Sequence, residues 1–135
     1  MSKLRLIDIG AANTRFADGW NEFKDSIELI LFEPDSRSYK ELAKQATVHT
    51  CALGATDELR ELYLTRKPEV SSFFKPNRSY VDLFPNKDRW DILDKANVET
   101  KALDSLQKDI GDIDFIKIDI QGAELEVLEG GKRLF

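Results

Sequence analysis

The sequence predicts an α/β protein built on a mostly parallel sheet that is wound with helices on both faces. Short apolar runs of strand length alternate with segments whose apolar residues recur at helical spacing. Several of these runs end at a glycine or at an acidic residue. Strands separated by helices pair in parallel through right-handed crossovers, so their carboxyl ends should meet at one edge. Ligands of such sheets bind at that edge.

Three strands and two helices are predicted in the first half. Residues Leu4–Ile9 and Ile27–Phe32 are apolar runs typical of strands buried on both faces, and a third strand is predicted over 48–53. A helix face between the first two strands is predicted from the i, i+4, i+7 spacing of three aromatic residues, namely Phe16, Trp20 and Phe23. A second helix is predicted up to Ala46, with Asp35 or Ser36 as its N-cap.

The second half is less regular. Residues 59–65 have strand propensity and could turn back against the third strand. Residues 68–85 are predicted to be a loop, in which Ser71 and Ser72 could contact a ligand. The remaining predicted elements are a strand over 98–102, a helix over Leu103–Ile110, a strand over 115–120 and a helix that follows Gly122.

Composition limits the possible functions. The 135 residues are 41% apolar and 33% charged, which fits one globular domain. A net charge of −5 argues against binding nucleic acid through bulk charge. With one cysteine and one histidine, neither an intrachain disulfide nor a His/Cys zinc site is possible within the chain, and no metal is expected. We see no apolar run of about 20 residues and no signal peptide, so we expect a cytoplasmic protein without membrane partners.

Polar sites follow the first two strands. Gly10 permits a tight turn and a close backbone approach to a ligand, and Asp8 is an acidic residue inside an apolar strand. Glu33 follows the second strand, where a carboxylate can accept two hydrogen bonds from a ribose diol. The alternative interpretation is a turn with a structurally paired Asp8 and a solvated Glu33. The combination of the three residues favours a nucleotide-like ligand.

A third polar site follows the last predicted strand. Lys117 and Asp119 share one face of that strand at a spacing of two. A lysine in a buried strand needs a counter-charge, and the candidates are Asp119, Asp8 and Glu124. The pair is either catalytic or a structural ion pair. Glu124 lies in the first turn of the last predicted helix, where negative charge is favourable on its own account.

Six segments, in chain order, resemble the FkbM-type methyltransferases: LIDIGAANTRF, LILFEPDSRSYKEL, TCALG, SSFFKPN, ALDSL and DFIKIDIQGAELEVLEGG. These are S-adenosylmethionine-dependent enzymes of the Rossmann-like class I type, associated mainly with methylation of hydroxyl groups on sugars and other small molecules. The resemblance covers nearly the whole chain. It implies one partial methyltransferase domain over 1–135 that lacks the last strands of the fold, and an uncovered sheet edge of that kind could support a homodimer.

The resemblance also implies roles for individual residues. Asp8, Gly10, Ala11 and the loop through Asn13 would hold the methionine part of the cofactor, and Glu33 would bind the ribose hydroxyls. Ala52 and Leu53 would lie beside the adenine. Asp119 and Glu124 would border the methyl-transfer site, with Lys117 tuning the charge of the catalytic carboxylate.

Two alternatives come from other functional classes. A nicotinamide-dependent dehydrogenase domain would share the glycine turn and the acidic residue after the second strand, but it prefers G-x-G-x-x-G, and the second and third glycines are missing after Gly10. The other alternative is a non-catalytic methyltransferase fragment that binds little.

Overall fold

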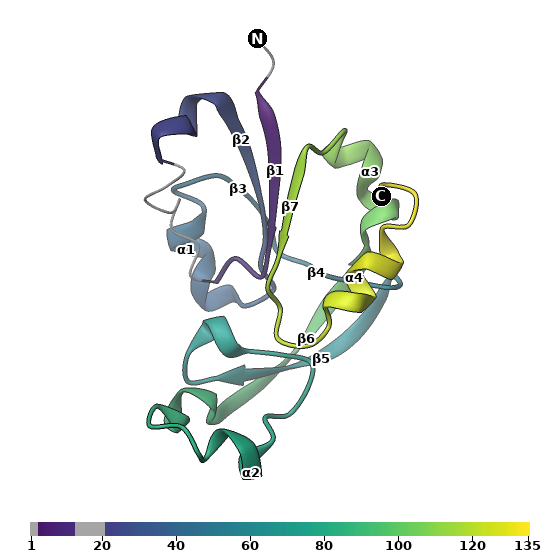
Figure 1. Cartoon of the computed structure of the whole chain (residues 1–135). Helices are drawn as coiled ribbons and strands as arrows, with labels where there is room; N and C mark the ends of the chain where they lie inside the picture. The colour runs from purple at the N-terminus through teal and green to yellow at the C-terminus, as the bar shows by residue number, and fades with distance from the viewer. Residues whose placement is uncertain (1–2, 13–20) are drawn as a thin grey trace.

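The computed structural model describes residues 3–12 and 21–135, which form two sheets with short helices around them (Figure 1). The first sheet has the strand order β3-β2-β1-β7, and all of its pairings are parallel. The carboxyl ends of its strands therefore lie at the same edge, as predicted. Its strands are β1 (Leu4–Ile9), β2 (Ile27–Phe32), β3 (Thr47–His49) and β7 (Phe115–Ile118).

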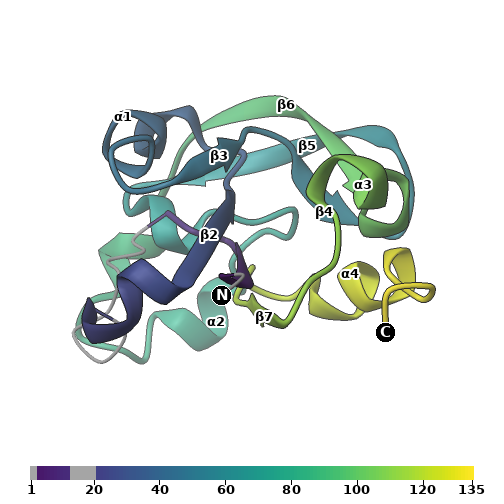
Figure 2. The same ribbon diagram turned by 90° about the horizontal axis from the view of Figure 1, so that it is seen from above.

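Helices cover both faces of this sheet, and Figure 2 shows α1 on one side and the pair α3 and α4 on the other. Leu42 of α1 packs with Leu31 on one face, and Leu103 of α3 and Val127 of α4 pack with Ile7 on the opposite face. The predicted Rossmann-like, doubly wound arrangement is confirmed. The helices are α1 (Tyr39–Leu42), α3 (Leu103–Ile110) and α4 (Glu124–Gly130).

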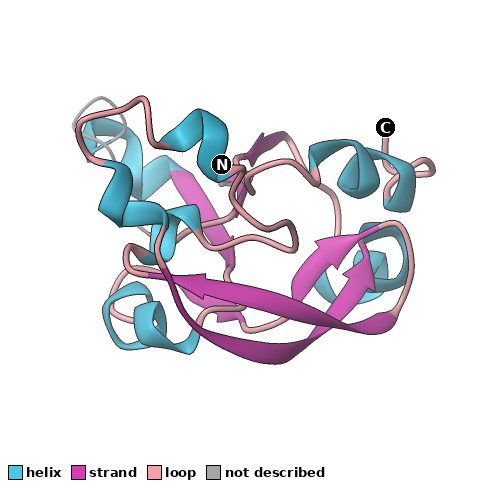
Figure 3. Cartoon of the chain, turned by 90° about the horizontal axis from the view of Figure 1, so that it is seen from below, coloured by secondary structure: helices cyan, strands magenta, loops and turns pink. Residues whose placement is uncertain are grey.

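The second sheet has the order β4-β6-β5, and Figure 3 shows its two long strands crossing the molecule. Strand β4 pairs with β6 in parallel, whereas β5 pairs with β6 in antiparallel register from Glu58↔Thr100 onward. Its small core is formed by Ala52, Leu62 and Val98. The strands are β4 (Ala52–Gly54), β5 (Glu58–Thr65) and β6 (Ile92–Ala102).

Two strand predictions are wrong in their pairing. The single strand expected over 48–53 is two strands in different sheets, because the chain leaves the first sheet after His49 and β4 then pairs with β6. The strand predicted over 59–65 exists, but it pairs with β6 rather than with the preceding strand. Strand β6 begins at Ile92, six residues before the predicted 98–102, and this length allows it to span β5.

Other boundaries also differ. The helix predicted up to Ala46 is a 3-10 turn over Ser36–Ser38 followed by the single-turn α1, although Asp35 is its N-cap as expected. The predicted loop 68–85 contains a 3-10 turn over Pro68–Val70 and helix α2 (Arg78–Val81). Two further 3-10 helices cover Asn21–Ser26 and Lys87–Trp90. Phe16 and Trp20 of the first predicted helix lie outside the described residues.

Strand β7 forms the outer edge of the first sheet as the structure describes it. Phe115 on this strand is 51% exposed. The predicted association of two copies through this edge stays a prediction. None of the helices in residues 3–12 and 21–135 has the length and apolar character needed to span a membrane.

Candidate active site

A cleft lies where the carboxyl ends of the first sheet face the second sheet. It encloses about 520 Å³, including solvent at its open mouth. The first sheet contributes the ends of β1 and β2 and the residues that follow β7, and the second sheet contributes β4 and part of β5. The segment 68–73, called the wall below, closes a further side of the cleft. The lining residues are Ile9, Gly10, Ala12, Phe32, Glu33, Pro34, Ala52, Leu53, Leu62, Pro68, Glu69, Ser71, Ser72, Phe73, Asp119, Ile120 and Gln121.

Glu33 is a buried carboxyl group in this lining, with 4% of its surface exposed. Its Oε1 accepts a hydrogen bond from the backbone N–H of Asp35 at 2.7 Å. The pKa of Glu33 is raised to about 7, chiefly by burial and also by the charges of Asp35 and Asp8, while hydrogen bonds from the N–H groups of Asp35 and Ala12 oppose the rise. A carboxyl group held at such a cost inside a cleft indicates a ligand-binding role.

Asp8 is buried beside Glu33 but lies outside the lining of the cleft. It is the register partner of Lys117, whose Nζ donates a hydrogen bond to Asp8 Oδ1 at 2.9 Å. The ammonium group stays half exposed, whereas the Asp8 side chain is 6% exposed. Asp8 is therefore the counter-charge of Lys117 among the three candidates, and the pair joins β1 to β7 below the cleft.

The residues after β7 are pressed against the turn after β1. The backbone N–H of Asp119 donates to the carbonyl of Ile9 at 3.0 Å. Gly10 has a φ of +84°, and a Cβ atom there would overlap the carbonyl oxygen of Asp119. Gln121 has a left-handed φ of 60°, unusual for a residue with a side chain, and its carbonyl accepts a hydrogen bond from Ser72 Oγ at 2.9 Å. Such strained backbone at a cleft is typical of functional sites.

Glu124 lies outside the lining of the cleft and binds the backbone just before its own helix. Its carboxylate oxygens accept hydrogen bonds from the backbone N–H of Gly122 at 3.1 and 3.0 Å. Partial burial raises the pKa of Glu124, but hydrogen bonds from four backbone N–H groups outweigh it, so the net pKa lies below its usual value. A carboxylate with a lowered pKa is a weak base, and of these two acidic residues Asp119 is the one that lines the cleft.

Comparison with protein-family models matches residues 8–135 to a model described as Methyltransferase FkbM domain. The chain belongs to the FkbM methyltransferase family. The match covers every residue of the cleft lining and every strand except the first four residues of β1. No curated protein and no solved structure matched the chain.

The FkbM-type site residues named from sequence divide into two groups. The structure brings together five of them at the cleft: Gly10, Glu33, Ala52, Leu53 and Asp119. Four others lie outside it for the following reasons. Asp8 and Lys117 bind each other, and Glu124 binds the backbone N–H of Gly122. Ala11 is fully buried, because it packs with Leu31 and Leu42. Asn13 lies outside the described residues.

Most of the wall was missed by sequence reasoning. The sequence suggests Ser71 and Ser72 as ligand contacts only from their polarity in a loop, and it does not assign Phe73 to the site. A signal was present in the unusual length of the loop, because long loops in compact domains are commonly functional. Within the described ranges, no group of three or more His, Cys, Asp or Glu side chains is arranged to hold a metal ion.

We expect Lys117→Met to lower the free energy of unfolding of this methyltransferase domain by about 2 kcal/mol, because it removes the ammonium group that binds the buried Asp8. Urea unfolding at pH 7 measures the change. The double variant Asp8→Asn with Lys117→Met should recover much of the loss, since neither charge is then left behind. If the double variant loses as much free energy of unfolding as the two single variants together, a direct interaction between Asp8 and Lys117 is contradicted.

Proposed function

We propose that this FkbM-family domain binds S-adenosylmethionine in the cleft and transfers its methyl group to a hydroxyl of a sugar or another small hydroxylated molecule. The observation that carries the proposal is the buried Glu33 carboxyl group at the carboxyl end of β2. In parallel α/β sheets, a carboxylate at this position can accept hydrogen bonds from both hydroxyls of a ribose.

The described residues fit such a cofactor. Gly10 lines the cleft, and its lack of a side chain lets the turn after β1 lie directly against the backbone of Asp119. Glu33 would bind the ribose, and Ala52 and Leu53 would provide an apolar surface for the adenine. The cleft between these groups is lined by small and apolar residues, which suits a nucleoside. When bound, the cofactor would supply an electrophilic methyl group on a sulfonium.

Asp119 is the residue that we assign to the acceptor. It lines the cleft beside Gly10, its side chain is exposed, and its Oδ1 accepts a hydrogen bond from Gln121 Nε2 at 3.3 Å. In the proposed reaction the acceptor oxygen gains the methyl group, its proton passes to the Asp119 carboxylate or to water, and the sulfur leaves with the bonding pair. Positioning of the acceptor by the residues after β7 would supply most of the rate enhancement.

Isothermal titration with S-adenosylhomocysteine tests the proposal. We expect the wild-type protein to bind S-adenosylhomocysteine and to bind NADH far more weakly, because the glycine turn lacks the second and third glycines of dinucleotide-binding domains. Tighter binding of NADH would favour the dehydrogenase alternative. The absence of binding by either compound would favour a non-catalytic fragment and overturn the proposal.

The affinity for S-adenosylhomocysteine should rise with pH. The ionised form of Glu33 accepts hydrogen bonds from the ribose hydroxyls, and the pKa of this group in the free protein is about 7. The binding-competent fraction is then about one tenth at pH 6 and nearly complete at pH 8, so Kd should fall about tenfold across this range. Titrations at both pH values measure the change. A Kd independent of pH would contradict the role of Glu33.

A further inference from the structure

Arg37 connects the loop that follows β2 to the wall across the cleft. Its Nη1 donates a hydrogen bond to the carbonyl of Thr65 at 2.8 Å, and its Nη2 donates to Ser71 Oγ at 3.2 Å. Thr65 ends β5 in the second sheet, whereas Arg37 follows β2 in the first sheet. The guanidinium group therefore spans the junction of the two sheets at the side of the cleft.

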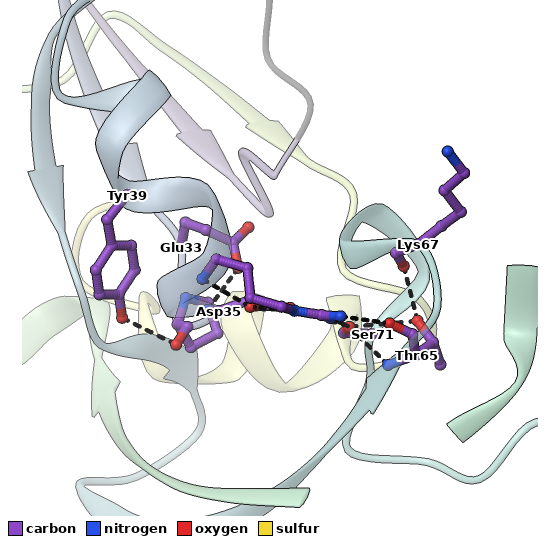
Figure 4. Close-up of polar contacts among 8 residues, drawn as sticks. Glu33, Asp35, Tyr39, Thr65, Lys67 and Ser71 are labelled. Carbon is purple, nitrogen blue, oxygen red and sulfur yellow. Dashed lines mark hydrogen bonds and ion pairs between the residues drawn. The ribbon is translucent and has the colours of Figure 1, made fainter. Parts of the chain in front are cut away.

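The same guanidinium group is held by Asp35, the acidic residue next to Glu33 and Pro34. Nε and Nη2 of Arg37 donate to the two carboxylate oxygens of Asp35 at 2.9 and 2.6 Å, and Asp35 is 1% exposed. The backbone N–H of Asp35 donates in turn to Glu33 Oε1. Figure 4 shows Glu33, Asp35, Ser71 and Thr65 in this network. One continuous set of hydrogen bonds thus runs from the Glu33 carboxyl group to the wall.

The other end of the wall is fastened independently. Ser72 Oγ donates to the carbonyl of Gln121, and the ring of Phe73 lies under the guanidinium group of Arg60 at 4.1 Å. Arg60 also pairs with Glu126 of α4. The wall is therefore attached at Ser72 and Phe73 by one set of contacts. On its other side Ser71 is held by Arg37 and by its own hydrogen bond to Asp35 Oδ2 at 3.3 Å, and Arg37 also holds Thr65 just before the wall.

We propose that Arg37 is a positioning residue for the nucleoside half of the ligand, because it fastens the wall to the loop that carries Glu33 and so sets the width of the cleft. This inference rests on the proposed function. An arginine is needed, since its planar group presents donors in several fixed directions at once. A lysine would keep the charge opposite Asp35 but has no such fork, so it cannot hold Asp35 and the Thr65 carbonyl in the same geometry.

Hydrogen exchange and titration with S-adenosylhomocysteine together test this role. In Arg37→Met we expect faster amide exchange in residues 66–74, unchanged exchange in α3, and binding of S-adenosylhomocysteine weaker by at least about tenfold. Arg37→Lys should show smaller increases in amide exchange and a smaller loss of affinity. Because lysine keeps the charge opposite Asp35, this variant provides the test if Arg37→Met does not fold. Arg78→Met is the matched control, because Arg78 pairs with Asp82 and Asp91 away from the cleft.

A charge readout separates positioning from a general loss of stability. The groups that face Glu33 are Asp35, Asp8 with its partner Lys117, Arg37 and Tyr39. Loss of the Arg37 charge leaves Asp35 uncompensated, so the midpoint of the pH dependence of binding should move upward in Arg37→Met and stay near the wild-type value in Arg37→Lys.

The outcomes divide as follows. Faster exchange in the wall together with weaker binding in both Arg37 variants, but not in Arg78→Met, supports the inference. Unchanged exchange in the wall, or full affinity despite a loosened wall, overturns it while the proposed function stands. Failure of the wild-type protein to bind S-adenosylhomocysteine overturns the proposed function and the inference with it.

Discussion

Glu33→Gln is expected to weaken binding of S-adenosylhomocysteine by about a hundredfold or more. A carboxylate that accepts two hydrogen bonds from ribose hydroxyls contributes more than a neutral amide, and charged hydrogen bonds are worth about 1.5–3 kcal/mol each. Glutamine has nearly the same shape and can still accept the N–H of Asp35, so the cleft should keep its form. Isothermal titration at pH 8 measures the loss.

The same substitution should make the free protein more stable above pH 7. In the unfolded chain the carboxyl group titrates near 4.5, and in the folded protein its pKa is raised to about 7, chiefly by burial. Between these values the folded state binds more protons, so stability falls as pH rises and the full penalty applies above pH 7. Removing the charge should therefore raise the free energy of unfolding at pH 8 by up to about 3 kcal/mol, with little effect at pH 4.

Urea unfolding of wild type and Glu33→Gln at pH 4 and pH 8 measures this gain. Glu41→Gln is the control, because Glu41 lies on the exposed surface of α1 with Lys44 as its partner. Lower affinity together with higher stability is the pattern of a residue kept for binding at a cost to folding. A Glu33→Gln protein that is less stable than wild type at pH 8 would show that the carboxylate has a structural role.

Gly10→Ala is expected to destabilise the fold by about 3 kcal/mol or more. A Cβ atom at this position would overlap the carbonyl oxygen of Asp119, and the φ of +84° is strained for any residue with a side chain. The obstacle is backbone, which cannot rotate away as a side chain could. Relief requires β1 and the residues after β7 to separate, which would also displace Asp119.

Thermal and urea unfolding of Gly10→Ala measure this effect. Gly131→Ala is the matched control: its φ is −115°, and the nearest atom to an added Cβ belongs to the exposed Phe135 ring, which can move. We expect a loss below about 1 kcal/mol there. Near-wild-type stability of Gly10→Ala, with S-adenosylhomocysteine affinity retained, would contradict the close packing of these two turns.

The elements that sequence predicted best are those whose signal is local. Strands β1 and β2 and helix α3 have the predicted bounds, because a buried parallel strand is a continuous apolar run and α3 carries its own apolar spacing. Glu33 was found for the same reason, since the end of a buried strand is visible in the sequence and the edge it reaches is set by parallel pairing.

Elements that depend on distant partners were predicted less well. The segment 48–53 gives no sign that its halves belong to two sheets, because that division depends on pairing with β6, much later in the chain. The partner of β5 was wrong for the same reason. From the sequence, three acidic residues could pair with Lys117. The register of β1 against β7 places Asp8 next to it and so determines the pair.

The sequence by itself determined the α/β class, the parallel sheet, the family and the position of Glu33 and Gly10, because each depends on patterns within a few residues or on motifs in a fixed order. Only the tertiary structure decided that the wall lines the cleft and that Arg37 joins it to the loop after β2. Their contacts join two sheets across long sequence separations, and a long polar loop has no periodicity from which its place against the cleft could be inferred.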